Sequence, residues 1–420
     1  MVDVLLERED EMGGKQLRKT LDKQLLSLPK KVKFCKLCVI SNQRPRIFFD
    51  NNGMCGACRH DYRKKHEINW SLRKNQLEQL CDKYRRKDGG WDVLVPGSGG
   101  KDSAYVAHVL KHEYGMHPLT ATWVPFKYTD IGYKNYINFV DAGFTNIQGH
   151  PNGKLHRKLA RICFEEVGDN FHPFIWGQHG FVFNTALKYD IKLVFYGENG
   201  SLEYGGNSSA KDISNIQMED HVVNVEKNSW KGATVNDVVK YGLKYKDYFT
   251  ENDFTQSDLL LYSLPSVNEL RGKGMQMHYM SYYHKWDPQE NFYYASEHTG
   301  YQANPVRSEG TYSKYASLDD KLDGFHFYLM FIKFGIGRAT SDAAHEIRDG
   351  HITRDEGVSL VKRYDEEFPT KYFEESLEYL DVDEAHFLEV VDSFRLPHVW
   401  VKTNGEWKLR HTVSQDGVDD

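Results

Sequence analysis

The run SGGKDS at residues 98–103 combines the groups that bind a polyphosphate. Its two glycines let backbone N–H groups approach an anion without a clash from Cβ. Ser98 and Ser103 add hydroxyls, Lys101 adds a cation, and Asp102 can hold magnesium. A glycine-rich turn without a ligand is the alternative, but so many anion-binding groups rarely gather for packing alone.

The residues around this run predict the elements that position it. The apolar run 93–95 predicts a buried strand, and the apolar spacing from Ala104 to Leu110 predicts a helix. The first turn of that helix would point unpaired N–H donors at a ligand. A Walker A loop does not fit, since Asp102 follows Lys101. Nor does a dinucleotide loop, whose third glycine would stand at position 102.

Further strands are predicted at 119–124, 145–148, 193–196 and 275–283. Helices are predicted at 67–87, before the loop, and at 154–167 and 173–189, between the third and fourth strands. These alternations predict a parallel sheet whose carboxyl ends meet at one edge and bind ligands there. Glu198 and Asn199 follow the strand 193–196, although Gly-Glu-Asn also suits a simple turn. Thr122 and Trp123 could contact adenine, or form an ordinary buried strand end.

Four cysteines have the spacing of a metal site: Cys35, Cys38, Cys55 and Cys58 form two C-x2-C pairs. Four protein ligands leave no open position, so we expect structural zinc, with an iron–sulfur cluster as the weaker alternative. A strand at 47–49 and a turn at 52–53 between the pairs would give a zinc ribbon.

Composition narrows the class of protein. The chain has 420 residues, of which 40% are hydrophobic and 14% aromatic, so it is globular. Its apolar windows are too short to span a bilayer, and its first residues lack a signal-peptide core. We therefore expect a cytoplasmic protein without a membrane partner.

Charge is spread unevenly along the chain. Residues 15–87 hold 20 basic and 6 acidic side chains, whereas the rest hold 34 basic and 54 acidic. The basic stretch could bind a nucleic acid, an anionic substrate or an acidic partner, or be a solvated surface.

From about residue 33 to about residue 396, the chain resembles the N-acetyl sugar amidotransferase family of bacterial surface-polysaccharide synthesis. The resemblance rests on the two cysteine pairs, the loop 98–103, the strand ending in Gly-Glu-Asn, and the segment FIKFGIGRATSDAAHEIRDGHITRDEG at 331–357. The loop itself resembles the pyrophosphate loop of the ATP pyrophosphatase (PP-loop) superfamily. The implied fold is α/β, with a parallel-sheet adenine-nucleotide-hydrolase-like (HUP) domain.

The resemblance also implies a division of the chain. Residues 1–32 would be an N-terminal arm, 33–66 the zinc-ribbon-like module, and 67–300 the PP-loop domain with an acceptor-binding insertion at 201–275. Residues 301–420 would be a mainly helical region ending in a hairpin at Asn404-Gly405, with a capping box from Thr353 to Glu356.

Roles for individual residues follow from the same resemblance. Catalysis would use Lys101, Asp102, Glu198 and Asn199, and Asp102 would hold magnesium. ATP would be bound by Pro96, Ser98, Gly99, Gly100, Lys101, Asp102, Ser103, Thr122, Trp123 and Gly197. Asp320, Lys321 and Asp323 could join the site, or could form a solvated helix start.

The implied reaction converts an acetamido group of a nucleotide-linked sugar into an acetamidino group, as in O-antigen and lipopolysaccharide synthesis. ATP would activate the amide oxygen with release of pyrophosphate, and ammonia would displace AMP. Hydrolysis of glutamine needs an activated thiol. The chain starts with Met1-Val2, and Cys81 and Cys163 lie in helical patterns without a nucleophile motif. We therefore expect a separate glutaminase subunit to supply ammonia.

Two alternatives remain open. A tRNA-modifying thiolase of the same superfamily would suit the basic stretch, because phosphate contacts dominate RNA affinity. The acidic remainder and the lack of a cysteine pair to carry sulfur argue against nucleic acid. A non-catalytic scaffold would retain the loop for stability only, and the intact Lys101, Asp102 and Ser103 argue against it.

Overall fold

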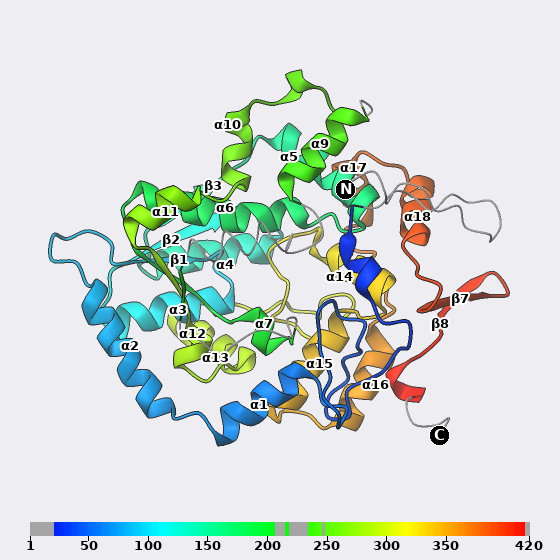
Figure 1. Cartoon of the computed structure of the whole chain (residues 1–420), viewed down its shortest axis with the longest axis horizontal. Coiled ribbons are helices and arrows are strands. Elements are labelled where there is room, and N and C mark those ends of the chain that lie inside the picture. The colour runs from blue at the N-terminus through cyan, green and yellow to red at the C-terminus, as the bar shows by residue number, and fades with distance from the viewer. Residues whose placement is uncertain (1–20, 206–214, 218–233, 246–247, 416–420) are drawn as a thin grey trace.

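One six-stranded sheet organises the chain in the computed structural model, which describes residues 21–205, 215–217, 234–245 and 248–415 (Figure 1). The strands lie in the order β3-β2-β1-β4-β6-β5. They are β1 (Val93–Pro96), β2 (Pro118–Trp123), β3 (Asn146–Gly149), β4 (Leu193–Tyr196), β5 (Asn215–Gln217) and β6 (Gln276–Tyr279). The first five in that order are parallel, and β5 runs antiparallel to β6. The predicted parallel α/β sheet is therefore confirmed.

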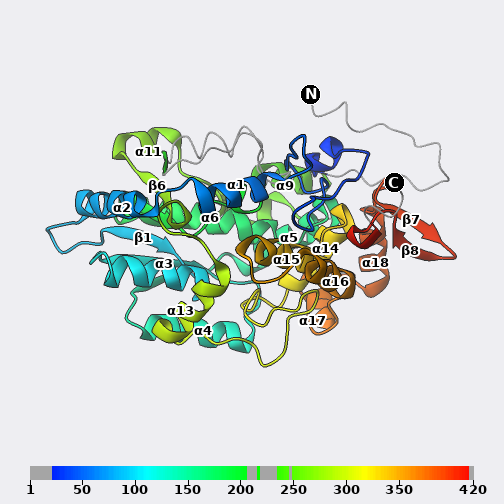
Figure 2. The ribbon, with the colours of Figure 1, turned by 90° about the horizontal axis from the view of Figure 1, so that it is seen from below.

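Both faces of the sheet are buried by helices. In β1 the side chains of Val93 and Val95 enter one hydrophobic cluster and that of Leu94 enters another, as the alternation of a strand requires. Figure 2 shows α3 and α13 below the sheet and α6 above it. Double coverage explains why the central strands β1 and β4 are continuous apolar runs.

The helices before the C-terminal region include those that the sequence predicts at 67–87, after the loop 98–103, at 154–167 and at 173–189. They are α1 (Gly56–His66), α2 (Trp70–Tyr84), α3 (Lys101–His112), α4 (Asp130–Asp141), α5 (Gly153–Val167), α6 (His172–Lys188), α7 (Gly200–Glu203), α9 (Val235–Lys244), α10 (Gln256–Leu259), α11 (Val267–Lys273), α12 (Met280–Tyr283) and α13 (Pro288–Thr299). Short 3-10 turns lie at Lys23–Ser27, Glu251–Asp253 and Leu260–Tyr262. The prediction of a strand over 275–283 is only half right, because β6 ends at Tyr279 and the chain then turns into α12.

The C-terminal region is helical and ends in a hairpin, as predicted. Its elements are α14 (Asp323–Phe334), α15 (Arg338–Asp349), α16 (Arg354–Tyr364), α17 (Phe373–Leu380), α18 (Glu384–Ser393), β7 (Trp400–Thr403), β8 (Glu406–Leu409) and a 3-10 turn at Val413–Gln415. The capping box at the start of α16 and the turn at Asn404-Gly405 are both present.

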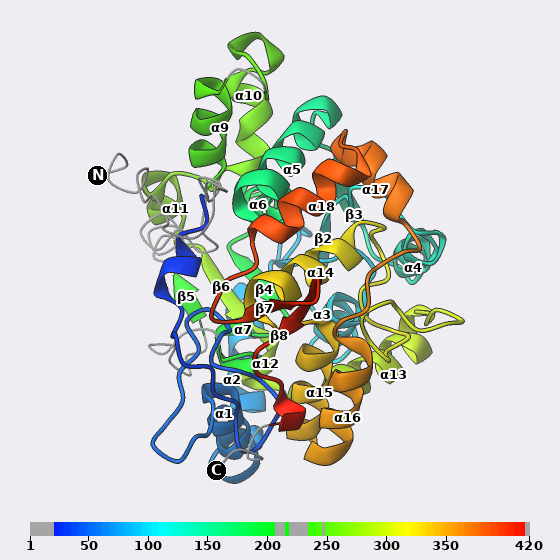
Figure 3. The same ribbon diagram turned by 90° about the vertical axis from the view of Figure 1, so that its right-hand side faces the viewer.

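Two hydrophobic clusters join this region, whose ribbon Figure 3 shows in yellow to red, to the rest of the molecule. Residues of α14, α17 and α18 pack on Ala160 and Phe164 of α5. Ala343 and Ala344 of α15 pack in a cluster with the four cysteines. The C-terminal helices are therefore held between the sheet domain and the cysteine module.

The cysteine module is not the expected zinc ribbon. The turn at Asn52-Gly53 is present, and Gly53 has a φ of 79°. The strand predicted at 47–49 is wrong, since Phe49 forms only an isolated bridge with Cys55. Cys55 is instead the N-cap of α1, so the second cysteine pair begins a helix.

Some predictions lie partly outside the described residues. These are the N-terminal arm, at residues 1–20, and the acceptor-binding insertion, at 206–214, 218–233 and 246–247.

Within the described residues, every helix is too short or too polar to cross a lipid bilayer.

Candidate functional site

The loop between β1 and α3 has the geometry of an anion-binding turn. β1 ends at Pro96, and Gly100 is the N-cap of α3 without a capping side chain among the described residues. The N–H groups of the first turn of α3 are thus left for a ligand, at the positive end of the helix dipole. Ser103 lies in that turn, and its hydroxyl donates to the Gly100 carbonyl at 3.0 Å.

Gly99 is required where it stands. Its φ is +83°, which side chains rarely adopt, and a Cβ there would lie 2.7 Å from the Asn135 carbonyl oxygen and from the Tyr136 Cα. Gly97 donates its N–H to the Ala121 carbonyl at 2.9 Å, and its own carbonyl accepts from the Thr122 hydroxyl. The loop is therefore pressed against α4 and tied to β2.

Lys101 and Asp102 start α3 and form an ion pair. The second carboxylate oxygen of Asp102 accepts from the Asn291 amide of α13 at 3.0 Å. The ammonium of Lys101 lies 5.9 Å from the centre of the Tyr315 ring. Both charged groups are thus held at the loop by residues from distant parts of the chain.

Glu198 faces the loop from the end of β4. Burial, and then the charge of Asp102, raises the pKa of Glu198 to about 7. Two carboxylates that repel each other in this way would be stabilised by a divalent cation between them. Asp102 and Glu198 therefore fit the role of magnesium ligands.

Gly197 and Asn199 shape the turn after β4. A Cβ at Gly197 would lie 2.7 Å from the Trp286 ring. The Asn199 side chain accepts from the Ser201 N–H at 3.1 Å and caps α7, and its backbone N–H donates to Ser281. The side chain of Asn199 thus has a structural role in the turn, as the interpretation of Gly-Glu-Asn as a simple turn predicts.

A pocket opens where these elements meet, at the point where the strand order reverses between β1 and β4. We refer to it as the loop pocket. It is lined by Lys101, Asp102, Glu198, Tyr204, Trp286, Asp287, Pro288, Gln289, Ser313, Tyr315, Ala316, Arg338, Ser341, Asp342, His345, Glu346, Asp349 and His351. Of the predicted catalytic residues, Lys101, Asp102 and Glu198 are in this set.

Sequence reasoning missed one whole wall of the pocket, the polar face of α15. Arg338, Asp342, Glu346 and Asp349 recur three or four residues apart, which places them on one side of the helix. Within this face, Arg338 pairs with Asp342 at 3.0 Å. The spacing in the sequence predicts a polar face on this helix, but it does not predict which other element that face contacts.

Thr122 and Trp123 lie inside the sheet domain rather than on the loop pocket. The Thr122 hydroxyl donates a hydrogen bond to the Gly97 carbonyl and lies 3.1 Å from the Asn146 amide oxygen. Trp123 is 3% exposed and packs with Phe181 and Tyr262. Their positions favour the buried-strand-end interpretation over contact with adenine.

Among the charged residues just before α14, a different residue lies at the loop than the sequence predicts. Asp320 accepts from backbone N–H groups of Phe126 and Leu322, and Lys321 pairs with Glu375. Neither they nor Asp323 line the loop pocket. Instead, the preceding residue, Asp319, lies beside Ser98, and burial raises the pKa of Asp319.

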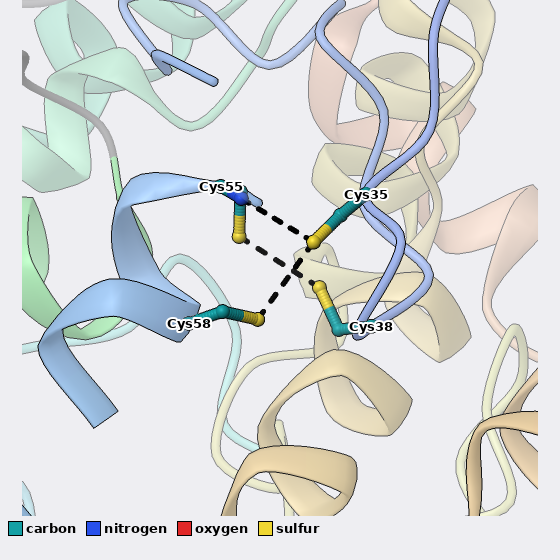
Figure 4. Close-up of side chains that lie close together, drawn as sticks. All are labelled: Cys35, Cys38, Cys55 and Cys58. Atoms are coloured by element: carbon teal, nitrogen blue, oxygen red, sulfur yellow. Dashed lines mark hydrogen bonds between the residues drawn. The ribbon is translucent and has the colours of Figure 1, made fainter. Parts of the chain in front are cut away.

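The four cysteines come together as predicted (Figure 4). Their side chains are 0 to 4% exposed, and the Cys35–Cys58 and Cys38–Cys55 sulfur pairs are each 3.8 Å apart. Sulfurs around a tetrahedral zinc with bonds of ~2.3 Å would lie ~3.8 Å apart, so the spacing fits. Backbone N–H groups of Leu37 and Cys55 donate to the Cys35 sulfur at 3.4 and 3.3 Å, which favours a thiolate. The cluster could bind structural zinc.

Comparison with known proteins bears on the C-terminal region. Residues 309–413 match the family described as "LPS biosynthesis protein WbpG-like, C-terminal domain". The match supports a lipopolysaccharide-biosynthesis family. It includes α15, whose polar face lines the loop pocket. A comparison with curated proteins finds no match.

Proposed function

We propose that the chain is the synthetase component of an ATP-dependent amidotransferase that acts on an N-acetyl sugar in lipopolysaccharide or O-antigen synthesis. One observation carries the proposal. Lys101 and Asp102, which follow the anion-binding loop at the start of α3, and the α15 face of the WbpG-like region line the same pocket. A general nucleotide loop and a region similar to lipopolysaccharide-synthesis proteins thus converge on one site.

In the proposed reaction the loop 98–103 holds the phosphates of ATP and leaves the α-phosphorus open to attack. The amide oxygen of the acceptor attacks it, the bond to the β-phosphate oxygen breaks, and pyrophosphate leaves. Ammonia then adds to the activated carbon and AMP departs, which leaves an amidine. Lys101 and the N–H groups of α3 would stabilise the developing phosphate charge. Asp102 and Glu198 would hold magnesium, which supplies further charge neutralisation.

The cysteines support a separate glutaminase as the source of ammonia. All six lie in the described residues, and four form the metal-type cluster. Cys81 and Cys163 are fully buried, and burial raises the pKa of Cys81 to about 12 and that of Cys163 well above its usual value. Neither is an accessible thiolate of the kind that glutamine hydrolysis needs.

The test measures products. Purified chain, magnesium, ATP and an ammonium salt are incubated with UDP- and CMP-linked N-acetyl sugars, and nucleotides and sugars are analysed by mass spectrometry. We expect AMP and pyrophosphate to form, with a sugar lighter by ~1 mass unit, because oxygen is replaced by NH. Glutamine alone should give no product.

Asp102→Asn should lower AMP formation at least ~100-fold, while Asp355→Asn, an exposed carboxylate on α16, should leave it unchanged. Formation of ADP and orthophosphate would refute the proposal. Salt-sensitive binding of tRNA would instead favour a tRNA-modifying enzyme.

A further inference from the structure

A second group of metal-binding side chains lies in the loop pocket, apart from the cysteines. Asp287, Asp349 and His351 bring their ligand atoms within 4.8 Å of one another. Donors on one ion with bonds of ~2.1 Å lie ~3 to ~4.2 Å apart, so small side-chain shifts would let all three bind together. We propose that these three residues form a site for a divalent transition-metal ion such as Mn²⁺.

Asp287 is already held in place by the helix that it starts. As the N-cap of α13, it accepts from the N–H groups of Gln289 and Glu290 through Oδ1, at 3.0 and 3.2 Å. Its Oδ2 lies 3.0 Å from His351 Nε2. One carboxylate oxygen is thus used for structure, and the other is directed at the proposed site.

Asp349, the last residue of α15, provides an independent sign of a ligand. Its Oδ2 lies 3.0 Å from His345 Nδ1, one turn earlier on the same helix. Its Oδ1 is buried without a hydrogen-bond partner among the described residues, and the side chain is only 2% exposed. A buried carboxylate oxygen without a partner is costly, and a cation would compensate it.

His351 completes the site from outside the helix. Gly350 has a φ of +87° and ends α15, so that the chain turns and His351 lies over the pocket. The His351 side chain is 28% exposed, whereas that of Asp287 is 9% exposed. An ion could therefore enter from solvent and settle on two buried carboxylates.

The donor set selects the kind of metal. Imidazole nitrogen suits iron, nickel, copper and zinc, and carboxylate oxygen suits manganese, whereas magnesium is usually bound by oxygen alone. Three protein ligands leave coordination positions open, and the pocket side is where a further ligand would bind. A Mn²⁺-type ion with exchangeable positions fits better than a closed structural site.

The charge of the pocket indicates a role for the ion, and this role rests on the proposed function. Six carboxylates line the pocket, while its lysine and arginine residues are Lys101 and Arg338 alone. Phosphates of ATP or of a nucleotide sugar would be repelled unless cations neutralise the carboxylates. We assign the ion the role of binding a substrate phosphate in the loop pocket.

Mn²⁺ alone is the probe, added to the full chain without nucleotide or sugar. Bound Mn²⁺ loses its six-line solution EPR signal, so titration gives the affinity. Pulsed EPR of the frozen sample detects coupling to a histidine nitrogen. We expect one bound ion with such coupling, which a site made of Asp102 and Glu198 could not produce.

Variants make the result specific. Asp349→Asn should weaken Mn²⁺ binding at least ~10-fold, and His351→Ala, at a partly exposed position, should abolish the nitrogen coupling without a folding risk. Asp355→Asn is the matched control and should bind as the unaltered chain does. Absence of bound Mn²⁺, or equal binding by all variants, would show that Asp287 and His351 form only an ion pair.

The two proposals fail separately. Binding of Mn²⁺ with histidine coupling, but no AMP formed from ATP and sugar, would leave the cation site in place and remove only its role toward phosphate. AMP formation by a chain that binds no Mn²⁺ with histidine coupling would refute the inference and leave the proposed function intact.

Discussion

Gly99 is the position in the anion-binding loop where a methyl group has least room. Gly99→Ala would place Cβ at 2.7 Å from the backbone of α4 and would keep a φ of +83°. We expect it to cost ~1–3 kcal/mol of stability and to weaken ATP binding at least ~10-fold. Thermal unfolding and calorimetric titration with ATP would measure both effects.

Gly89 offers a matched control. It has a φ of +81°, but a Cβ there would meet nothing within 4 Å. Gly89→Ala should therefore show the conformational cost alone, ~1–2 kcal/mol, with ATP binding unchanged. If both variants bound ATP as the unaltered chain does, the close approach of the loop to α4 would have no functional importance.

His156 makes stability depend on pH. It is 3% exposed, stacks on Phe126, and has its Nδ1 2.8 Å from the Tyr262 hydroxyl. Burial lowers the pKa of His156 to about 3 from an ordinary value of 6.5. Below pH 6.5 the unfolded state binds a proton at His156 that the folded state does not bind, which favours unfolding. The free energy of unfolding is therefore highest above pH 6.5 and decreases as pH falls below that value. The loss should be ~1.4 kcal/mol per pH unit below 6.5.

Chemical unfolding at pH 7.5, 6.5 and 5.5 tests this. His156→Gln should unfold with a shallower pH dependence over that range. His117→Gln, at an exposed histidine, should retain the slope of the unaltered chain. Identical slopes for all three proteins would mean that His156 is already protonated in the folded state.

Between elements, a buried ion pair joins α1 to α7. Lys64 Nζ lies 2.8 Å from Glu203 Oε2, with the side chains 2% and 1% exposed. Burial alone would raise the pKa of Glu203, but the charge of Lys64 acts in the opposite direction, and this pKa is lowered to about 2. Lys64→Met should cost ~3–5 kcal/mol, because a buried carboxylate would lose its partner. The midpoint of chemical unfolding measures this loss.

Two further variants show whether pairing is the cause. Lys64→Met with Glu203→Gln should recover a large part of the loss, since the uncompensated charge is gone. Lys127→Met breaks an exposed pair with Glu378 and should change stability by less than ~1 kcal/mol. A double variant no more stable than Lys64→Met alone would contradict the argument.

Elements that depend on local pattern could be predicted from the sequence. The apolar run 93–95 could be identified as a strand because it is buried on both faces, and the capping box at Thr353 because its groups are neighbours in sequence. The strand at 47–49 failed because its partner is a helix start at Cys55. The α15 wall of the pocket and the contact of Asp319 with Ser98 depend on tertiary packing, which local pattern does not contain.

At the scale of the molecule, the four-cysteine cluster connects the N-terminal module to α15. Removal of its metal with a strong chelator should release ~1 zinc per chain. The unfolding temperature should fall, because the four cysteine side chains would lose the metal ion that links them. Metal analysis and thermal unfolding measure the change. Because α15 packs on this cluster, the loop pocket should also lose affinity for ATP.

A pair of cysteine variants provides the control. Cys38→Ser should purify without a full equivalent of zinc, whereas Cys81→Ser should retain it, because Cys81 packs in a hydrophobic cluster away from the site. Equal zinc content in the two variants would rule out the cluster as the metal site.

The loop pocket draws its lining from residues as far apart as Lys101 and His351. During synthesis on the ribosome, the turn between β1 and α3 emerges long before α15, which forms the other wall of the pocket. A chain stopped by a premature codon between residues 198 and 338 would carry an open half-site, with Lys101, Asp102 and Glu198 but none of the α15 side chains. Fragments of this protein that contain only the sheet should therefore be poor guides to what the whole chain recognises.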